Sequence, residues 1–346
     1  MIGYHQPDML LPPFMTPFLL PILTLAATVI LGLLLVRLAV PLGFIDLPGD
    51  RKVHTLPTPR TGGLAMVGGG GLMFGLALAL GWIPWPIIPW QTWLAGLGFI
   101  TVGAADDRFS FHPRQKFLVL LALSVLATWP WVLVLRATGV PWLPAAWTAS
   151  PLLLAGAAIL ITFWFMAVPN AVNIEDAING YMGGFTFLVL LGLAARGVDT
   201  RIALGALLGF LLLNWPKARQ FMGDAGSFGC GFFLAEAILR GGGLAHPSMA
   251  LFMTAPISLD VAMGLIRRKK LGMTIFTADR ATCPHHLLAL TGGNILLATS
   301  LLWLNAAGFV FLANRPWLAL GQTVLYVLLL VILNRKLVLP ITTQGL

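Results

Sequence analysis

The sequence predicts an all-α, polytopic integral membrane protein, and three properties of the 346-residue chain support this fold class. Hydrophobic residues make up 58% of the chain, charged residues make up 10%, and the mean hydropathy is +0.90. A soluble protein carries roughly 25% charged residues. The length would allow about two soluble domains, but the charges are too few to cover their surfaces. We therefore expect a single membrane domain over residues 1–346.

The apolar runs define the expected helices, because a membrane span needs about 20 apolar residues with few charges. Charges and clusters of proline and glycine divide the chain into eleven such segments. In order, they cover residues 17–40, 62–82, 89–105, 115–136, 151–168, 181–195, 201–215, 226–240, 248–266, 293–313 and 316–334. The sequence thus predicts about eleven transmembrane helices, several of them short.

The basic residues predict the orientation of these helices. With the N-terminus outside, sixteen of the 21 Lys and Arg residues fall on the inner side of the membrane and five on the outer side. Cytoplasmic loops retain positive charge, so an outer N-terminus and a cytoplasmic C-terminus are expected. The net charge of +9 then belongs to loops at the bilayer surface, and no nucleic-acid partner is expected.

Nine of the twelve acidic residues fall on the same inner side. They are Asp46, Asp50, Asp106, Asp107, Glu175, Asp176, Asp224, Asp260 and Asp279. Carboxylates that face a negatively charged leaflet are unfavourable unless a cation or basic groups compensate them. The sequence therefore predicts a metal-dependent site at the cytoplasmic surface, built from the loops near residues 41–61, 105–116, 169–180, 216–226 and 267–290.

Asp106 and Asp107 follow the third apolar segment directly. Adjacent carboxylates raise each other's pKa unless a cation neutralises them, and Mg²⁺ is a cation that prefers oxygen ligands. A hydrated loop turn is the alternative interpretation of this pair.

Asp224 lies just before the eighth apolar segment, within Arg219-Gln220-Phe221-Met222-Gly223-Asp224-Ala225-Gly226-Ser227. It could cap a helix that begins near Ser227. A cap does not need the basic residues Lys217 and Arg219 upstream, whereas a diphosphate does. This favours a Mg²⁺ ligand, with Phe221 offering a face on which a base can stack.

Asn170, Asn173 and Asp176 stand three residues apart at the end of the fifth apolar segment. Residues three apart share one face of a helix, so they form a polar stripe. Polar groups at membrane depth usually face a cavity or the bundle interior. Hydrogen bonding between helices is the alternative role.

Two further segments carry groups suited to phosphate. Residues 46–63 include Lys52 and His54, which suit an anionic lipid headgroup but are also compatible with an ordinary basic loop. His285 and His286 offer two more donors, although two adjacent histidines alone are weak evidence.

Taken together, these segments resemble the polyprenyl-phosphate N-acetylhexosamine-1-phosphate transferases, glycosyltransferase family 4. The matching motifs are Arg-Lys-x-His, Asp-Asp, Asn-x-x-Asn-x-x-Asp and Phe-Met-Gly-Asp-x-Gly-Ser, in the family's order between Asp46 and Arg280. The resemblance implies transfer of a sugar 1-phosphate from a UDP-sugar to undecaprenyl phosphate with Mg²⁺ and release of UMP. It also implies a location in the bacterial inner membrane, with the active site facing the cytoplasm.

The expected mechanism gives each motif a role. Asp224, together with Asp107, is expected to hold Mg²⁺, or Mn²⁺ in its place. Asp106 or Asp107 is expected to act catalytically by accepting a proton from the lipid phosphate; the choice is left open, as is a two-step route through a phosphorylated aspartate. The expected substrate-binding residues are Lys52, His54 and Lys116 for the lipid phosphate, Asn170, Asn173 and Asp176 for the nucleotide-sugar, Phe221 for uracil, and Arg280, His285 and His286 for the diphosphate or sugar.

Two departures from the family pattern bear on the sugar. The chain reads Asp176-Ala-Ile-Asn-Gly where Asp-Gly-x-Asp-Gly is usual, and residues 279–286 carry two histidines where three are common. The residue before Pro284 is restricted to extended conformations, which suits a compact donor. We expect UDP-GlcNAc or a deoxy relative such as UDP-FucNAc, used to initiate O-antigen (lipopolysaccharide) or another surface polysaccharide.

Other functions stay open at this point. The main alternative is the phospho-MurNAc-pentapeptide translocase of peptidoglycan synthesis. A secondary transporter would depend almost entirely on Glu236, the one acid placed deep in a segment. A catalytically inactive scaffold conflicts with the intact aspartates. The expected partners are UDP-N-acetylhexosamine, undecaprenyl phosphate and the lipid bilayer, and a homodimer is left open.

Overall fold

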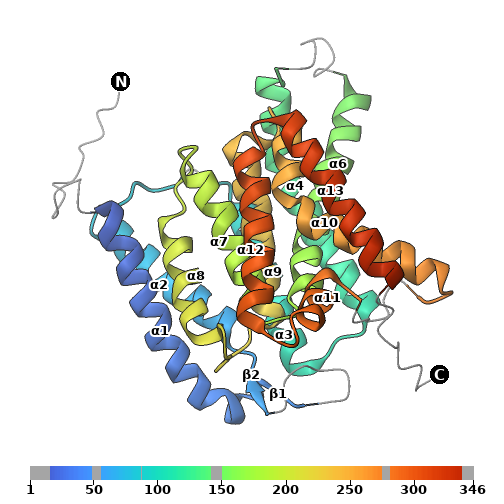
Figure 1. The fold of residues 1–346 in the computed structure, drawn as a ribbon. Coiled ribbons are helices and arrows are strands. Elements are labelled where there is room, and N and C mark those ends of the chain that lie inside the picture. Colours follow the sequence, from blue (N-terminus) through green and yellow to red (C-terminus); the bar gives the residue numbers. More distant parts are fainter. Residues whose placement is uncertain (1–15, 49–55, 87, 142–149, 275–280, 337–346) are drawn as a thin grey trace.

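The computed structural model describes residues 16–48, 56–86, 88–141, 150–274 and 281–336, and these form a bundle of helices (Figure 1). The helices are α1 (Thr16–Leu42), α2 (Gly62–Ala79), α3 (Trp90–Phe109), α4 (Pro113–Thr138), α6 (Pro151–Glu175), α7 (Tyr181–Ala194), α8 (Arg201–Asn214), α9 (Gly223–Ile238), the π-helical turn η1 (Leu239–Gly243), α10 (Pro247–Lys270), α11 (Cys283–Leu290), α12 (Ile295–Leu312) and α13 (Pro316–Lys336). Two short antiparallel strands, β1 (Ile45–Asp46) and β2 (Thr58–Pro59), pair Ile45 with Pro59 and Asp46 with Thr58.

Each of the eleven predicted apolar segments coincides with a helix, and the short α11 lies outside them. Within the described residues, seven helices are long and apolar enough to cross a membrane: α1, α2, α4, α6, α10, α12 and α13. The all-α, multi-span fold class is therefore confirmed. Helices α7 and α8 have 14 residues each, which rise about 21 Å against a hydrocarbon core of about 30 Å. The number of eleven crossings stays a prediction.

Proline marks the start of several helices. Pro113, Pro151, Pro247 and Pro316 each begin a helix, and Pro284 is the second residue of α11. The expectation that Cys283 is extended is therefore wrong, because Cys283 begins α11 and the extended residue is Thr282. The first backbone N–H groups of a helix have no partner inside it, so proline costs nothing there and its fixed φ favours the helix. The same residue type that interrupted the apolar runs therefore sets the helix starts.

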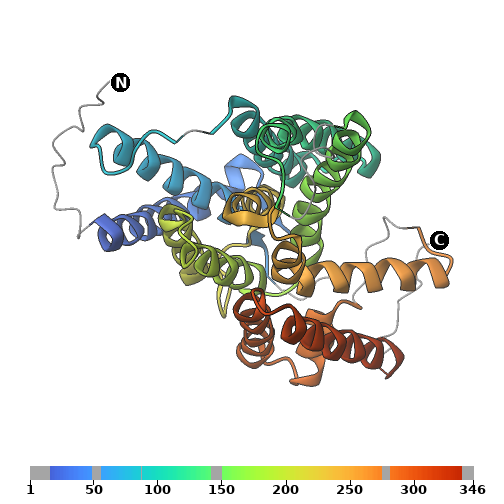
Figure 2. The same ribbon diagram turned by 90° about the horizontal axis from the view of Figure 1, so that it is seen from above.

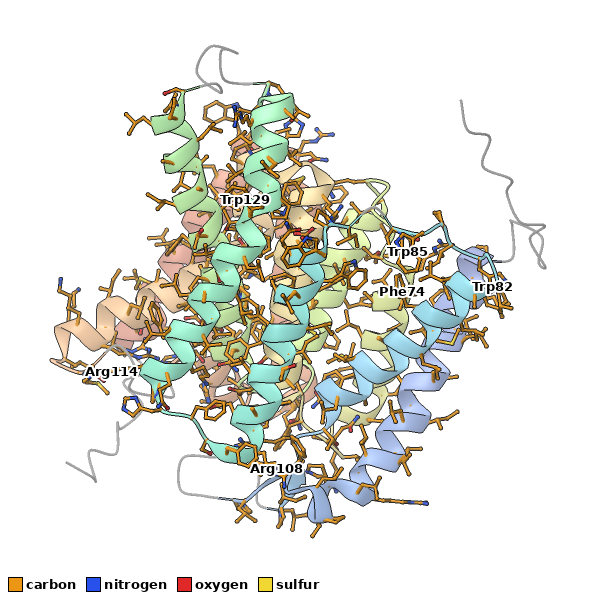
Figure 3. All side chains as sticks on the ribbon, turned by 180° about the vertical axis from the view of Figure 1, so that it is seen from behind. Phe74, Trp82, Trp85, Arg108, Arg114 and Trp129 are labelled. Carbon is orange, nitrogen blue, oxygen red and sulfur yellow. The ribbon has the colours of Figure 1, made fainter. Side chains whose placement is uncertain are left out.

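Successive helices alternate in direction, so the connections collect at two ends of the bundle (Figure 1). We call the end that carries β1, β2 and α11 the hairpin end. Arg108 and Arg114 lie toward this end, whereas Trp82, Trp85 and Trp129 lie toward the opposite end (Figure 3). Tryptophan is enriched at membrane interfaces. Which end faces the cytoplasm stays a prediction from the charge count.

Helix α9 lies in the middle of the bundle, against α2, α3, α6 and α7 (Figure 2). Close approach is possible because small residues line it: a Cβ atom at Gly103 would overlap the backbone of Asp224. Farther along α9, the ring of Phe232 lies 5.2 Å from that of Phe99 and 5.4 Å from that of Phe165, centroid to centroid. Such packing, rather than hydrophobic transfer, holds helices together in lipid, and here it fixes the start of α9 against the end of α3.

Helix α10 extends sideways from the rest of the bundle (Figure 2). Four basic residues, 267–270, form its last turn, where positive charge is favourable beside the unpaired carbonyls of a helix end. Its buried face includes Asp260, which is 1% exposed. Asp260 falls in the second half of the predicted ninth span; that this half is the inner one stays a prediction.

Candidate active site

A cavity of about 460 Å³ opens at the hairpin end. Its walls come from five connections that are far apart in the sequence. The polar residues that line it are Asp46, Arg60, Asp107, Asn173, Asp176, Asn179, Asn214, Asp224, Ser227 and His285. Each of the five loops singled out in the sequence thus contributes described residues to one cavity.

Asp106 lies in the last turn of α3, and its carboxylate is bound from two sides. Oδ1 accepts a hydrogen bond from the backbone N–H of Phe111 at 2.8 Å, and Oδ2 accepts one from Nζ of Lys116 at 2.9 Å. The chain can turn back to make these contacts because Ser110 adopts a left-handed conformation, with φ 53°. Asp106 therefore faces the first turn of α4.

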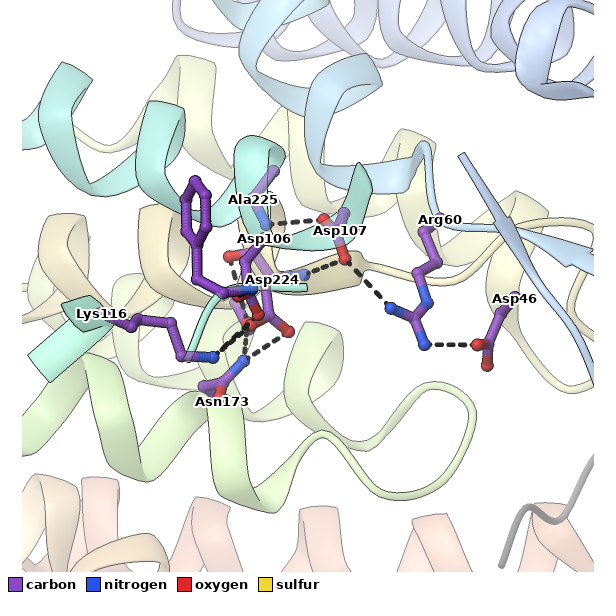
Figure 4. A network of polar contacts seen from close by, with 10 residues as sticks. Asp46, Arg60, Asp106, Asp107, Lys116, Asn173, Asp224 and Ala225 are labelled. Carbon is purple, nitrogen blue, oxygen red and sulfur yellow. Dashed lines mark hydrogen bonds and ion pairs between the residues drawn. The ribbon is translucent and has the colours of Figure 1, made fainter. Parts of the chain in front are cut away.

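Asp107 faces the start of α9 instead. Its Oδ1 accepts from the backbone N–H of Asp224 and its Oδ2 from that of Ala225, both at 3.0 Å (Figure 4). The first N–H groups of a helix lack partners within it, so a side chain of α3 caps α9. A Cβ atom at Gly223 would lie 2.6 Å from Oδ2 of Asp107, so glycine is needed there.

Burial raises the pKa of Asp107 to about 7, although its two backbone N–H donors oppose the rise. The neighbouring charge of Asp224 adds to the rise, and Arg60 opposes it from 3.8 Å. Arg60 also forms an ion pair with Asp46, which joins β1 to β2 (Figure 4). The structure thus places Arg60 between two carboxylates.

Asp224 lies at the centre of the polar network. Its Oδ2 accepts from Nζ of Lys116 at 3.0 Å, and its Oδ1 accepts from Nδ2 of Asn173, also at 3.0 Å (Figure 4). Lys116 therefore bridges Asp106 and Asp224. The alternative that Asp224 caps a helix beginning near Ser227 is wrong, because α9 begins at Gly223 and Asp107 supplies the cap.

The polar stripe of α6 divides between two roles. Asn173 and Asp176 line the cavity, whereas Asn170 donates to the carbonyl of Met166 one turn back, at 2.7 Å, and is not part of the lining. Asp176 follows the last residue of α6. Burial, together with the negative charges of Asp224 and Asp107, raises its pKa to about 7.

The two histidines of α11 also differ. His285 lines the cavity, and its Nδ1 lies 2.8 Å from Oγ1 of Thr282. His286 is 1% exposed, and its Nδ1 lies 3.0 Å from the carbonyl of Thr282. Only the first of them can meet a ligand in this arrangement. Phe221 also lines the cavity, and its stacking on uracil stays a prediction. Lys52, His54 and Arg280 lie outside the described residues.

Asn214 is a site residue that the sequence analysis missed. Its Oδ1 accepts from the backbone N–H of Gly180 at 2.6 Å, and its Nδ2 donates to the carbonyl of Gln220 at 2.9 Å. It thus ties the loop after α6 to the loop before α9. The sequence feature that could have indicated this role is a polar residue, Asn214, at the end of an apolar segment and two residues before Pro216.

The donor set can be compared with what Mg²⁺ needs. Within the described residues, no three His, Cys, Asp or Glu side chains are placed to hold an ion by themselves. Proteins usually bind Mg²⁺ through one or two carboxylates together with substrate phosphates and water. Asp106 and Asp224, which share the ammonium of Lys116, fit such a site.

Comparisons with known proteins place the chain among enzymes. Residues 90–242 match the sequence model of a family described as "Glycosyl transferase family 4". The chain is 27% identical to a "Probable undecaprenyl-phosphate N-acetylglucosaminyl 1-phosphate transferase" of Bacillus subtilis, over 84% of this chain and 81% of that protein. It is 30% identical to a "Decaprenyl-phosphate N-acetylglucosaminephosphotransferase" of Mycobacterium tuberculosis, over 72% and 70%. It is also 33% identical to a "Phospho-N-acetylmuramoyl-pentapeptide-transferase" of a Synechococcus strain, over 53% and 56%.

Proposed function

The chain belongs to glycosyl transferase family 4, and we propose from this premise that it transfers an N-acetylhexosamine 1-phosphate from a UDP-sugar to undecaprenyl phosphate and releases UMP. The observation that carries the proposal is the pair of carboxylates, Asp106 and Asp224, joined by Lys116 beside a cavity of about 460 Å³. Reaction between two phosphate-bearing substrates needs cationic groups at such a position.

In the proposed reaction, an oxygen of the lipid phosphate attacks the phosphorus that carries the sugar. A new P–O bond forms, the bond from that phosphorus to the bridging oxygen breaks, and UMP leaves with the electron pair. Holding both phosphates in line supplies part of the rate enhancement. Lys116, whose ammonium reaches both carboxylates, is placed to hold the attacking phosphate near the first turn of α4.

The site suits a Mg²⁺ or Mn²⁺ ion, which when bound would neutralise negative charge on the leaving UMP. Asp224 is our first choice of ligand. Asp106 and Asp107 are both candidates for the second ligand and for the group that accepts a proton from the lipid phosphate. Asp106 shares the ammonium of Lys116 with Asp224, whereas Asp107 lines the cavity and accepts from the backbone of α9. Each oxygen of Asp107 accepts one hydrogen bond and keeps a second lone pair, so Asp107 could hold an ion and cap α9 together.

The remaining cavity walls would bind the nucleotide-sugar. Asn173 and Asp176 lie on one wall, Phe221 offers a ring for uracil, and His285 faces the cavity from α11. Lys52, His54 and Arg280 remain proposed phosphate contacts. For the donor we propose UDP-GlcNAc or a deoxy relative, since two of the relatives above carry N-acetylglucosamine in their names. The product would start a surface polysaccharide at the cytoplasmic face of the bacterial inner membrane.

The test is to incubate the purified protein with undecaprenyl phosphate, MgCl₂ and a panel of UDP-sugars, and to measure UMP and the mass of the lipid product. UMP should form with a UDP-N-acetylhexosamine only when the lipid is present, and EDTA should stop it. Turnover of UDP-MurNAc-pentapeptide alone would establish the alternative reaction. Absence of UMP with every donor would overturn the proposal.

A further inference from the structure

One wall of the cavity is formed by the connection from α6 to α7, residues 176–180, which we call the cavity loop. Asp176, Ala177, Ile178 and Asn179 line the cavity. A side chain that binds a ligand is only as well placed as the residues that support it. The groups that hold the cavity loop from behind therefore bear on how the cavity fits a ligand.

The end of α8 holds the cavity loop through two hydrogen bonds. The backbone N–H of Gly180 donates to Oδ1 of Asn214 at 2.6 Å, and Nδ2 of Asn179 donates to the carbonyl of Pro216 at 3.1 Å. Trp215 lies between these two acceptors in the chain and packs directly on Gly180, where a Cβ atom would overlap its indole. A shift of Trp215 would therefore move both acceptors and the loop with them.

Helix α12, which lies beside α7 (Figure 1), fixes the indole of Trp215 in turn. Nε1 of Trp215 donates to Oγ1 of Thr299 at 2.8 Å, and its ring lies 4.8 Å from that of Trp303, centroid to centroid. Thr299 is 0% exposed, and its hydroxyl donates its own hydrogen to the carbonyl of Ile295, so it can accept from the indole. Nε1 of Trp303 donates to the carbonyl of Tyr181, just after the loop, at 3.3 Å. Two side chains of α12 thus hold the loop from both of its flanks.

We propose that Trp215 and Thr299 are positioning residues, whose hydrogen bond fixes the cavity loop and thereby sets the fit of the UDP-sugar. The ligand in this statement rests on the proposed function, whereas the link from α12 to the loop rests on the contacts above. Neither side chain lines the cavity. Lys116, the proposed contact of the lipid phosphate, is held by Asp106 and Asp224 instead, so the lipid substrate should not be affected.

The kinetic test uses substitutions that break or preserve this hydrogen bond. Thr299→Val removes the acceptor and should raise the KM for the UDP-sugar roughly fivefold, the equivalent of about one lost hydrogen bond, with kcat and the KM for undecaprenyl phosphate within about twofold of the wild type. Thr299→Ser keeps the hydroxyl and should stay within about twofold throughout. Thr254→Val is the matched control, because Thr254 is 1% exposed and its hydroxyl donates to the carbonyl of Ala250 one turn back in α10. It should leave both KM values unchanged.

A second readout does not depend on turnover. The backbone N–H of Gly180 is hydrogen-bonded, so amide hydrogen exchange in residues 176–182 reports on how firmly the loop is held. Thr299→Val should speed this exchange about fivefold or more, whereas Thr299→Ser and Thr254→Val should not. If Thr299→Val is not recovered as folded protein, Trp215→Phe removes the same hydrogen bond from the other side and keeps an aromatic ring.

The outcomes separate the two proposals. Faster exchange in the loop, together with a rise in the KM for the UDP-sugar alone, supports the positioning role. Unchanged exchange in Thr299→Val, equal rises in both KM values, or equal effects of Thr299→Val and Thr299→Ser would overturn it. If no UDP-sugar is turned over at all, the proposed function fails, and the exchange rates still decide whether Trp215 and Thr299 hold the loop.

Discussion

The two ends of the bundle differ in how their buried charges are compensated by neighbouring groups. At the opposite end, Glu236 forms an ion pair with Arg240 at 2.7 Å and accepts from Nε1 of Trp131 at 2.8 Å, so one acid meets one base. At the hairpin end, Asp46, Asp106, Asp107 and Asp224 share the positive charges of Lys116 and Arg60. Asp176 adds a further carboxylate to the same cavity.

This difference separates a structural charge from a binding site. The Glu236 cluster is balanced and complete, so it fixes α4 against α9 and needs no ligand. Among the residues that the structure describes, the hairpin-end cluster has more carboxylates than cations, and such a group is stable only if protons or further cations compensate it. The comparison also removes the basis of the transporter alternative, because Glu236, on which that alternative depended, is already paired.

The largest loss of activity should follow substitution of Asp224, which lies at the centre of the hairpin-end cluster. Asp224→Asn keeps the shape of the side chain and an oxygen for Asn173, but it loses the negative charge. Charge stabilisation of this kind is worth several kcal/mol, and each 1.36 kcal/mol is about tenfold in rate, so UMP release should be abolished in folded protein. Retention of more than a tenth of the wild-type rate in saturating Mg²⁺ would show that Asp224 is not the essential ligand.

The adjacent aspartates should respond differently from each other. Asp106→Asn keeps its bond to Phe111 and should lower kcat by about tenfold or more with little change in thermal stability. Asp107→Asn places an N–H₂ group against an N–H donor of α9, so it should cost about 1 kcal/mol of stability, as for loss of a helix cap. The two variants are compared by UMP release and by thermal unfolding in detergent. Equal losses of stability would mean that Asp107 does not act as the cap.

The different partners of Asp106 and Asp107 could not be predicted from the sequence, whereas the helices and several site residues could. The apolar runs predicted the helices. The acids on one side of the membrane predicted a site containing Asp106 and Asp224, and the polar stripe at residues 170, 173 and 176 predicted Asn173. Neighbours in a helix, however, point about 100° apart, so Asp106 and Asp107 face different partners although their adjacency suggested a common role. His285 and His286 separate for the same reason.

Contacts between segments that are far apart in the chain could not be predicted from the sequence either. Asp260 was predicted to lie on the inner side, but its hydrogen bond from the backbone N–H of Cys283 joins α10 to α11, and no local pattern records which helices pack together. Asn214 was missed because it acts by bonding two backbone groups, which needs no charge and no motif. Burial within the tertiary structure, rather than residue type, selects such groups.

A smaller effect is expected from the balanced pair at the opposite end. Glu236→Gln keeps an oxygen for the indole of Trp131 and loses the ion pair with Arg240, whose side chain is 34% exposed. Solvent weakens such a pair, so the loss should be about 1 kcal/mol of unfolding free energy, with UMP release per folded molecule unchanged. A matching fall in the rate in saturating substrate would contradict the division of the molecule into a structural and a catalytic charge cluster.

The smallest expected effect is a change in the thermal stability of the metal-free protein with pH, which depends on the excess of carboxylates at the hairpin end. The pKa values of Asp107 and Asp176 are raised from 3.8 to about 7 in the folded state, so folding binds these protons more tightly than the unfolded chain does. Their contribution to stability is complete below about pH 4 and is lost as the pH rises through about 7.

In EDTA, the thermal midpoint should therefore be higher near pH 5 than near pH 8, and Mg²⁺ should raise it more at the higher pH, where the carboxylates are ionised. Asp176→Asn should flatten this profile, and a profile unaffected by both the substitution and Mg²⁺ would show that the cavity carboxylates are not the source of the excess charge.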